Sequence, residues 1–424
     1  MGKRILMTTT GSLGDLHPFI AIGLELRARG HQVTLATSNF YRSKVEQTGL
    51  RFAPMGPHLT LEDSVEIGRV MDLKKGAEYL VRHILYPSVP AAYEEVMEAA
   101  RGADLIVTHP ITFASQIAAE KTGMPWVSTV TAPLSFFSRY DPSVIAPYPY
   151  LTRLRALGPG FYGAVLKLGR FRTNFWREPL DGFRASVGLP PGRDPLFEGQ
   201  HSPQRVLAMF SALLAKAQPD WPAQAIATGF PFYDQAEHGQ EIDPALDRFL
   251  SEGPPPVVFT LGSSAVQQPG SFYRESLIAI SRLGCRAVLL IGRNSLPGPL
   301  PTGSMAFPYA PFSKVFPRAA VIVHQGGIGT CAQALAAGRP MLVVPYAFDQ
   351  PDNAARLQRL GVARSISRAK YTGRRAKSEL EHLLNDKAYA ARAEDVARKL
   401  AAENGVRAAA EVIETHTPTE YLVT

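Results

Sequence analysis

Two titratable side chains lie in a glycine-rich turn close to the start of the chain. The stretch "GSLGDLHP", residues 11–18, contains Asp15 and His17 two positions apart. A carboxylate or an imidazole at the end of a strand can take a proton from a hydroxyl group as a general base. Structural roles are the alternative, because aspartate commonly caps a helix and a histidine before Pro18 can satisfy backbone groups. Both interpretations stay open for this turn.

A second glycine-rich turn lies in "VIVHQGGIGT", residues 321–330, between an apolar run and a helical stretch. Its glycines let backbone N–H groups approach an anion at the N-terminus of a helix. The spacing fits neither a Walker A loop nor a GxGxxG dinucleotide turn. It favours a phosphate-binding turn over a plain strand–turn–helix connection, with contacts from His324, Gly326, Gly327, Gly329 and Thr330.

Further polar and aromatic residues stand near the ends of neighbouring apolar runs. Asp349 and Gln350 follow the run at 341–345 and carry groups suited to sugar hydroxyls. Tyr309 precedes the run that leads into the phosphate turn, where its ring can stack on a nucleobase, and Ser263 ends another run. Since the carboxyl ends of parallel strands meet at one edge of a sheet, these residues predict a site for a nucleotide joined to a sugar.

Both halves of the chain alternate strand-like and helix-like segments, which must position these residues. Residues 3–37 read as strand, helix and strand, and the pattern returns at 103–130. In the second half, runs of Val, Ile and Leu are typical of central parallel strands covered by helices on both faces. The sequence therefore predicts an α/β protein of two doubly wound parallel-sheet, Rossmann-like domains that face a cleft. Residues 134–176 have no clean period and are expected to form long loops and short helices.

Composition narrows the class of protein. The 424 residues are 46% hydrophobic and 19% charged, which is typical of a globular chain long enough for two domains. The net charge of +8 favours anionic partners, and no signature of nucleic-acid binding is present. The chain has two cysteines, too few for a disulfide framework. Its N-terminal apolar run is too short for a secretory signal. No apolar stretch approaches the roughly 20 residues that span a bilayer. We therefore expect a cytoplasmic protein.

Together these motifs resemble the family-1 glycosyltransferases of the GT-B fold, which use nucleotide sugars. The resemblance runs from "GSLGDLHPFIAIG" to the box "HQGGIGT…DQPDN" and so covers the whole chain. The stretches "HSPQRV", "QPDWP" and "TGFPFYD" are most similar to the rhamnosyltransferase of rhamnolipid synthesis, and the N-terminal turn is similar to that of sterol and glycopeptide glucosyltransferases. We accordingly expect an acceptor-binding domain at 1–228, a linker at 229–256, a nucleotide-sugar-binding domain at 257–400, and a C-terminal helix and tail at 401–424.

The resemblance also implies roles for single residues. The base would stack on Tyr309, and the backbone around Phe312 would read its pyrimidine edge. The plant-type box differs from this sequence, because it has Trp-Asn-Ser where this sequence reads Gly-Ile-Gly and a ribose-binding Glu where Gln333 stands. The remaining contacts implied are His324, Gly327, Gly329, Thr330 and Ser263 for the diphosphate, and Asp349 and Gln350 for the sugar.

By the same resemblance the reaction is an inverting transfer, in which one base deprotonates the acceptor hydroxyl as it attacks the anomeric carbon. Asp15 matches the aspartate of the bacterial glycopeptide and sterol branches and is the expected base. His17 is its competitor, and His109 is a further group that could orient Asp15 or share its proton. With no DxD at a strand end and no clustered His/Asp ligands, we expect no metal and no cofactor, the diphosphate charge being met by a helix N-terminus and His324.

The acceptor is expected to be an apolar hydroxyl compound such as a lipid, a polyphenol or a sterol. Candidates for the apolar wall of its cleft are Phe136, Phe137, Tyr140, Tyr148, Tyr150, Phe161 and Tyr162. Basic residues stand among apolar ones in the same region, which is typical of a surface that contacts anionic membrane and suggests peripheral contact at the inner membrane surface. They are Arg153, Arg155, Lys167, Arg170, Arg172 and Arg177.

Two other functions fit the same fold. One is a sugar-nucleotide epimerase, which would need no apolar acceptor loop. The other is a non-catalytic glycosyltransferase-like partner protein, which would have less reason to keep Asp15, His324, Asp349 and Gln350 together. For a transferase, the donor is a UDP-sugar or a dTDP-sugar, with UDP-glucose and dTDP-rhamnose as the two candidates.

Overall fold

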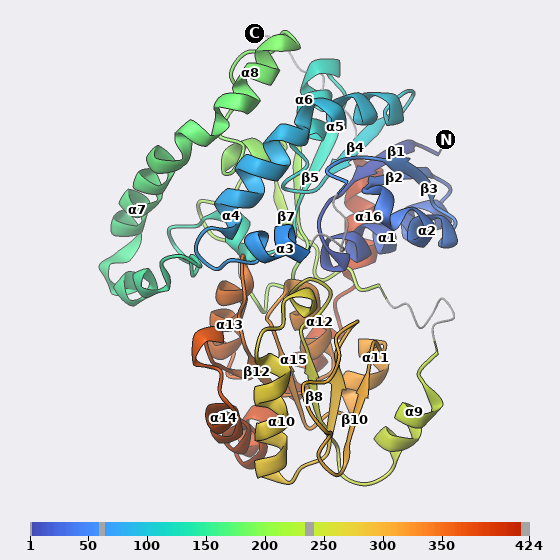
Figure 1. The fold of residues 1–424 in the computed structure, drawn as a ribbon. Coiled ribbons are helices and arrows are strands. Elements are labelled where there is room, and N and C mark those ends of the chain that lie inside the picture. Colours follow the sequence, from blue (N-terminus) through green and yellow to red (C-terminus); the bar gives the residue numbers. More distant parts are fainter. Residues whose placement is uncertain (1, 59–63, 234–240, 417–424) are drawn as a thin grey trace.

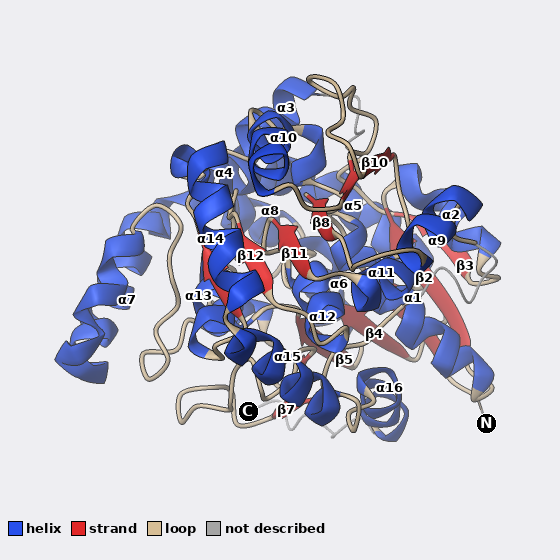
Figure 2. Ribbon diagram, turned by 90° about the horizontal axis from the view of Figure 1, so that it is seen from below, coloured by secondary structure: helices blue, strands red, loops and turns tan. Residues whose placement is uncertain are grey.

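The chain forms two α/β halves, one above the other in the computed structural model drawn in Figure 1. The structure describes residues 2–58, 64–233 and 241–416. The upper half in that view carries the blue and green segments and the lower half the yellow and orange ones. Seen from below in Figure 2, the red strands lie between blue helices.

Seven parallel strands form the sheet of the first half, in the order β3-β2-β1-β4-β5-β6-β7. Strands β4 and β5 are buried along their whole length, as expected where helices cover both faces. The strands are β1 (Arg4–Thr8), β2 (Gln32–Thr37), β3 (Arg51–Pro54), β4 (Leu105–Thr108), β5 (Trp126–Val130), β6 (Arg205–Ala208) and β7 (Ala225–Ala227).

The helices of the first half include three long ones that pack on this sheet or beside it, α1 (Leu13–Ala28), α5 (Tyr86–Ala99) and α6 (Phe113–Thr122). A π-helical segment (Leu80–Leu85) leads into α5. The remaining helices are α2 (Arg42–Gln47), α3 (Ser64–Val70), α4 (Gly76–Tyr79), α7 (Gly158–Thr173) and α8 (Glu178–Ser186), with shorter turns η1 (Asn39–Tyr41), η3 (Pro133–Phe136), η4 (Pro149–Leu157), η5 (Asn174–Arg177) and η6 (Glu198–Gln200).

Six parallel strands form the second sheet, in the order β10-β9-β8-β11-β12-β13. They are β8 (Val257–Thr260), β9 (Ala287–Leu290), β10 (Ser304–Phe307), β11 (Val321–His324), β12 (Met341–Val343) and β13 (Ala363–Ser365). The helices are α9 (Pro244–Ser251), α10 (Phe272–Leu283), α11 (Phe312–Val315), α12 (Ile328–Ala336), α13 (Gln350–Arg359), α14 (Gly373–Asn385) and α15 (Lys387–Leu400), with turns η8 (Ala265–Gln267), η9 (Phe316–Arg318) and η10 (Arg368–Lys370).

Each sheet reverses its strand order beside its own first strand. Strand β1 lies between β2 and β4, and β8 lies between β9 and β11. Open α/β sheets bind ligands outside the carboxyl ends of the strands at such a switch point. The turn after β1 leads to Asp15 and the turn after β4 holds His109, while Ser263 follows β8 and His324 ends β11. The prediction of two doubly wound parallel-sheet domains is confirmed, and both switch points carry predicted site residues.

Helix α7 differs from what the sequence indicated. Residues 158–173 form one helix of 16 residues, where long loops and short helices were expected. Glycines at 158, 160, 163 and 169 lower its intrinsic helix propensity and obscured the period. Buried Tyr162, whose hydroxyl donates to the Leu151 carbonyl, holds the helix to η4 instead. No helix among the described residues is long and apolar enough to cross a bilayer.

The last helix returns to the first half. Helix α16 (Gly405–Thr415) packs beside α1, as the red helix in the upper half of Figure 1 shows. Its residues Ala409, Ala410 and Ile413 belong to the same buried cluster as the apolar face of α1. The predicted linker contains α9, whose Leu246 and Leu250 are buried in a hydrophobic cluster shared by both halves.

Candidate functional site

Asp15 is held in the first turn of α1 by a capping box. The Ser12 hydroxyl accepts from the Gly14 N–H at 3.2 Å, and Asp15 Oδ2 accepts from the Ser12 N–H at 2.8 Å. The N-cap is therefore Ser12, and Asp15 is its partner three residues later. Because the capping box uses only one carboxylate oxygen, the other remains for chemistry.

His109 lies beside that second oxygen. Its Nε2 is 3.3 Å from Asp15 Oδ1, and the two side chains are 5% and 27% exposed. The contact does not satisfy hydrogen-bond geometry, and neither ring nitrogen of His109 has a hydrogen-bond partner among the described residues. A buried imidazole with unused hydrogen-bonding capacity can orient a carboxylate or share its proton. The structure thus brings the predicted Asp15 and His109 together.

His17 does not join this pair. Two positions along a helix correspond to a rotation of about 200°, so the Asp15 and His17 side chains leave α1 on opposite sides. The His17 ring packs instead against Tyr233, with ring centroids 5.1 Å apart. Burial, with a smaller contribution from Lys44, lowers the pKa of His17 to about 4.

His324 presents an unused hydrogen-bond donor at the end of β11. Its Nδ1 accepts from the Gly326 N–H at 3.1 Å, so the neutral ring carries its proton on Nε2. That Nε2 is buried and has no partner among the described residues. Burial lowers the pKa of His324 to about 3, which keeps the ring neutral at physiological pH. A buried donor without a partner is costly unless a ligand or water supplies an acceptor.

The turn after His324 needs glycine for steric reasons. Gly326 has φ +91, and a Cβ there would lie 2.9 Å from Val343 Cγ1 and 3.1 Å from the Gln350 carbonyl oxygen. Gly327 is the N-cap of α12, and no side chain caps that helix. The first N–H groups of α12 therefore lack side-chain partners among the described residues, which is the arrangement of an anion site.

The N-termini of α1 and α12 meet across the two halves. A Cβ built on Gly329 would lie 3.7 Å from the Gly14 Cα, and the two helices are in contact. Each helix N-terminus carries a partial positive charge. An anion bound at the start of α12 would therefore lie close to the turn that holds Asp15.

Asp349 is linked through Asn353 to the turn after β11. Its Oδ2 accepts from Asn353 Nδ2 at 2.6 Å, and the same Nδ2 donates to the Gly326 carbonyl at 2.9 Å. Burial raises the pKa of Asp349 to about 7, the hydrogen bond from Asn353 opposes this, and the Asp15 carboxylate adds to it. Phe348, just before it, has the left-handed φ of 54, a conformation that clusters at functional sites.

Gln350 uses its side-chain oxygen within the protein. Its Oε1 accepts from the N–H groups of Tyr346 and Ala347 at 2.8 and 3.1 Å, which closes the loop between β12 and α13. The amide nitrogen is therefore the group through which Gln350 could contact a sugar. In the turn between β11 and α12, Thr330 Oγ1 accepts from Gln325 Nε2 at 3.4 Å, and Gln325 Oε1 is buried without a hydrogen-bond partner among the described residues.

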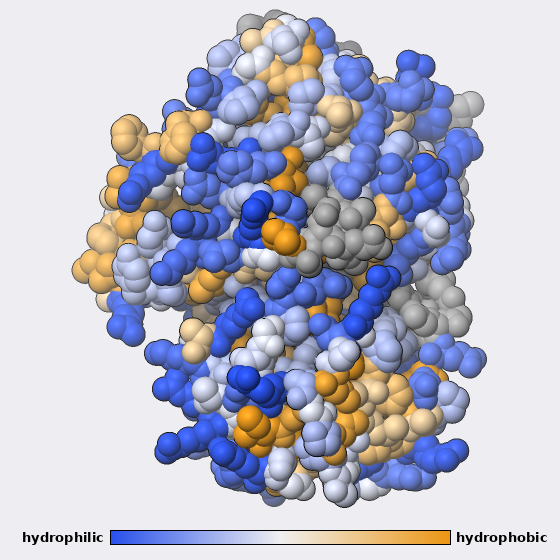
Figure 3. Space-filling view, viewed as in Figure 1, coloured by the Kyte–Doolittle hydropathy of each residue, from blue (hydrophilic) through white to orange (hydrophobic). Residues whose placement is uncertain are grey.

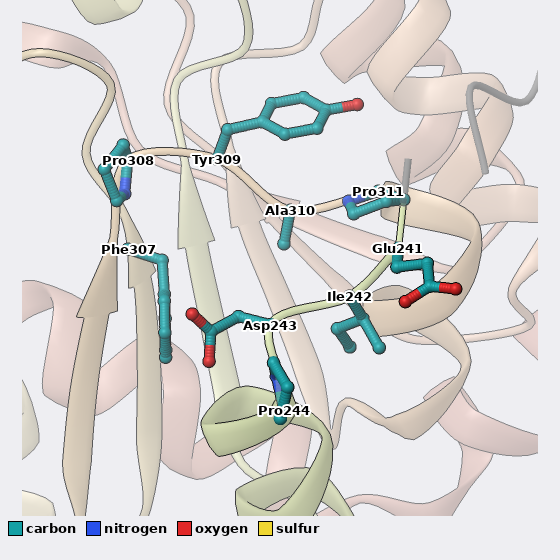
Figure 4. Close-up of a pocket in the computed structure, with 9 residues that line it drawn as sticks. All are labelled: Glu241, Ile242, Asp243, Pro244, Phe307, Pro308, Tyr309, Ala310 and Pro311. Atoms are coloured by element: carbon teal, nitrogen blue, oxygen red, sulfur yellow. The ribbon is translucent and has the colours of Figure 1, made fainter. Parts of the chain in front are cut away.

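Tyr309 borders a cavity of about 480 Å³ (Figure 4). Its side chain is 45% exposed and projects away from Phe307 in that view. Phe312 begins α11 and stacks on Phe316, with ring centroids 4.3 Å apart. Residues of the predicted linker also line this cavity. The sequence did not indicate this, because these residues form no recognisable motif. The lining residues are Glu241, Ile242, Asp243, Pro244, Phe307, Pro308, Tyr309, Ala310 and Pro311.

The predicted acceptor wall divides between core and surface. Phe136 stacks on Trp221 with centroids 4.0 Å apart and is 8% exposed, and Tyr162 is 3% exposed, so both belong to the core. Tyr140, Tyr148 and Tyr150 are exposed. The structure therefore does not bring the seven aromatic residues into one wall.

A buried charged cluster between the halves was not foreseen. Arg356 of α13 is 2% exposed, donates from Nε to Asp352 Oδ2 at 2.7 Å, and also pairs with Asp141 of the first half. The Val144 N–H donates to Asp352 Oδ1 at 2.9 Å. Asp141 and Arg356 are 215 positions apart, and no local pattern marks either of them. Elsewhere among the described residues, no group of three or more His, Cys, Asp or Glu is arranged to hold a metal ion.

Comparisons with known proteins identify the family of the chain. Residues 5–134 match the glycosyltransferase family 28 N-terminal domain, and residues 277–415 match the erythromycin biosynthesis protein CIII-like C-terminal domain. The chain is 33% identical, over 426 residues that cover 97% of both proteins, to O-mycaminosyltylonolide 6-deoxyallosyltransferase of Streptomyces fradiae.

Solved structures share the fold of this chain. The glycotransferase of kitacinnamycin is 26% identical with a TM-score of 0.72, covering 99% of this chain and 100% of that one. The spinosyn rhamnosyltransferase SpnG complexed with thymidine diphosphate is 18% identical with a TM-score of 0.69, covering 97% and 99%. The sequence-based recognition is confirmed: the protein belongs to the GT-B glycosyltransferases that join a family 28 N-terminal domain to a CIII-like C-terminal domain.

Proposed function

We propose that the protein is an inverting glycosyltransferase that moves a hexosyl group from a dTDP- or UDP-sugar to a hydroxyl of an apolar acceptor. One observation carries the proposal. The Asp15–His109 pair of the first half and the uncapped start of α12 in the second half meet where Gly14 faces Gly329. The proposed proton acceptor and the proposed anion site therefore face the same point from opposite halves.

In the proposed reaction, Asp15 takes the proton of the acceptor hydroxyl while its oxygen attacks the anomeric carbon. The bond from that carbon to the diphosphate oxygen breaks, and the nucleoside diphosphate leaves with the bonding electrons. Attack from the face opposite the leaving group inverts the anomeric configuration. His109, 3.3 Å from Asp15, would hold the carboxylate in position and stabilise the proton it gains.

The departing diphosphate would be stabilised by fixed donors. In the part of the chain that the structure describes, no side chain pairs with the first N–H groups of α12 or with the Nε2–H of His324. Such preorganised donors stabilise developing charge without reorganisation. We therefore propose transfer without a metal ion or other cofactor, and activity that does not fall in excess EDTA.

The donor base and the cellular location belong to the same proposal. The complex of a relative with thymidine diphosphate supports a dTDP-sugar, and Tyr309 would stack on the base beside its cavity. Cys285 and Cys331 are both free thiols, which supports a cytoplasmic location. Acceptor candidates are lipids, polyphenols and sterol-like alcohols.

Asp15→Asn tests the proposal. Asparagine can still accept the Ser12 N–H, so the helix cap and nucleotide binding persist, whereas turnover falls at least about 100-fold. Turnover is measured as nucleoside diphosphate released on addition of an acceptor, with dTDP-rhamnose and UDP-glucose compared as donors. The anomeric configuration of the product, read by NMR, checks inversion.

Ser12→Ala is the matched control. It removes the cap but keeps the carboxylate, so it should lower the unfolding free energy by about 1 kcal/mol and keep most of the turnover. Full activity in Asp15→Asn would show that Asp15 is not the general base, and His17 would then be the next candidate. Conversion of the donor sugar without any acceptor would instead indicate an epimerase.

A further inference from the structure

An exposed apolar face runs along α7. Ala164, Leu168 and Phe171 follow one another at spacings of four and three residues, so they share one side of the helix. Leu168 and Phe171 are 58% and 81% exposed. Phe175 of η5 continues the line, 56% exposed, with the Arg82 guanidinium over its ring. Figure 2 shows α7 standing away from the rest of the molecule, and Figure 3 shows hydrophobic atoms gathered on the left edge where α7 lies.

The segment that carries this face is basic and free of acidic residues. Residues 142–177 contain six Lys and Arg and no Asp or Glu. Three of the six form ion pairs with Asp141, Glu198 or Asp181, outside the segment. The remaining three basic residues form no ion pair with any described residue. They are Arg153, Lys167 and Arg172, and the last two flank the apolar face of α7.

We propose that α7 docks in the plane of an anionic lipid surface. Leu168 and Phe171 would enter the boundary between headgroups and acyl chains, while Lys167 and Arg172 contact lipid phosphates. An apolar stripe edged by cations is the pattern of an interfacial helix. Sixteen residues give a helix of about 24 Å, long enough to lie on a bilayer surface.

Charge favours lipid over a second copy of this protein. A symmetric contact between two α7 helices would bring their acid-free segments together, so that Lys167 and Arg172 would face like charges. The molecule as a whole carries +8, which adds to the repulsion. An anionic bilayer supplies the counter-charge that Lys167 and Arg172 lack among the described residues.

Vesicle flotation of the full chain tests the proposal without donor or acceptor, so its outcome is independent of the proposed transfer reaction. The protein should float with vesicles of equal parts phosphatidylglycerol and phosphatidylcholine, less so as salt is raised, and should not float with phosphatidylcholine alone. The double variant Lys167→Gln/Arg172→Gln should bind roughly fivefold more weakly for each charge removed. Leu168→Ser/Phe171→Ser should lose roughly tenfold or more.

The matched control is Arg374→Gln/Arg375→Gln on α14, which removes two exposed charges from the second half. It should change binding little. All variants should keep the wild-type thermal midpoint, because the replaced side chains are exposed. Equal binding to neutral vesicles, no binding to either kind, or an equal loss in the control would overturn the proposal. So would a dimer in solution that Leu168→Ser/Phe171→Ser converts to a monomer, since a second copy would then cover the stripe.

Discussion

His324 can donate through only one ring nitrogen, because the other already accepts from Gly326. We predict that His324→Leu weakens binding of dTDP and UDP roughly tenfold or more, since a hydrogen bond to a charged group is lost. Isothermal titration calorimetry measures the change. Because the pKa of His324 is about 3, the wild-type ring stays neutral between pH 5 and 8 and gives no pH dependence there. Unchanged affinity in the variant would mean that Nε2 does not contact the diphosphate.

Asp349 gives the free protein a pH-dependent stability. Its pKa is raised from 3.8 to about 7 in the folded state, so between these values the folded chain holds a proton that the unfolded chain has lost. Stability therefore falls as pH rises from about 4 to 7 and levels off above. We predict that Asp349→Asn raises the thermal midpoint at pH 8 and changes it little at pH 4. An equal change at both pH values would show that the effect is not electrostatic.

At the scale of the elements, the turn between β11 and α12 depends on the conformation of one glycine. Gly326→Ala places a Cβ against Val343 and the Gln350 carbonyl at a left-handed φ, so it should lower the unfolding free energy by about 1–3 kcal/mol and weaken nucleotide binding. In Gly329→Ala, the new Cβ would lie 3.7 Å from the Gly14 Cα, which is an ordinary contact distance. Because residue 329 lies inside a helix, where alanine is favoured over glycine, this variant should keep or slightly raise the unfolding free energy. Urea denaturation of both variants measures this contrast, and equal losses would contradict it.

Elements with strong local patterns could be predicted from the sequence. The buried runs of β4 and β11 are almost uniformly apolar, and the turns after β1 and β11 carry glycines and polar residues together. Parallel strands then bring Asp15 and His109 to one edge, which is why their pairing was foreseen. Helix α7 could not be predicted, because contacts rather than propensity stabilise it. The lining of the Tyr309 cavity by Glu241 and Asp243 also follows from tertiary packing alone.

At the scale of the whole molecule, Arg356 joins the two halves through its ion pair with Asp141. Arg356→Met leaves the Asp352 carboxylate buried without its cation, so we predict a loss of about 3–5 kcal/mol in unfolding free energy. The control Arg359→Met removes an arginine that is 39% exposed and lies 3.4 Å from Asp141, and should cost no more than about 1 kcal/mol. Urea denaturation measures both, and similar losses in the two variants would contradict the prediction.

The same cluster should limit how far the halves separate. Asp141 pairs with Arg356 across the interface, whereas Asp181 pairs with Arg177 within the first half. We predict that Asp141→Asn increases the radius of gyration measured by small-angle X-ray scattering, and that Asp181→Asn does not. An unchanged radius in Asp141→Asn would show that other contacts hold the halves closed. Since only the three-dimensional structure brings Asp141 near Arg356, no reading of the sequence could have predicted this restraint.

The return of α16 to α1 bears on how members of this family can be recombined. A chimera that takes its second half from a relative and is joined only once, within residues 229–256, would also import a foreign C-terminal helix. That helix would have to fill the space of Ala409, Ala410 and Ile413 beneath the resident α1. It would also have to end where the Lys3 ammonium can reach it, because that group donates to the carbonyls of Glu414 and His416 at 2.7 Å. Exchange of the second half between relatives therefore calls for a second crossover between α15 and α16, so that the second sheet and its helices are grafted as an insert rather than as a tail.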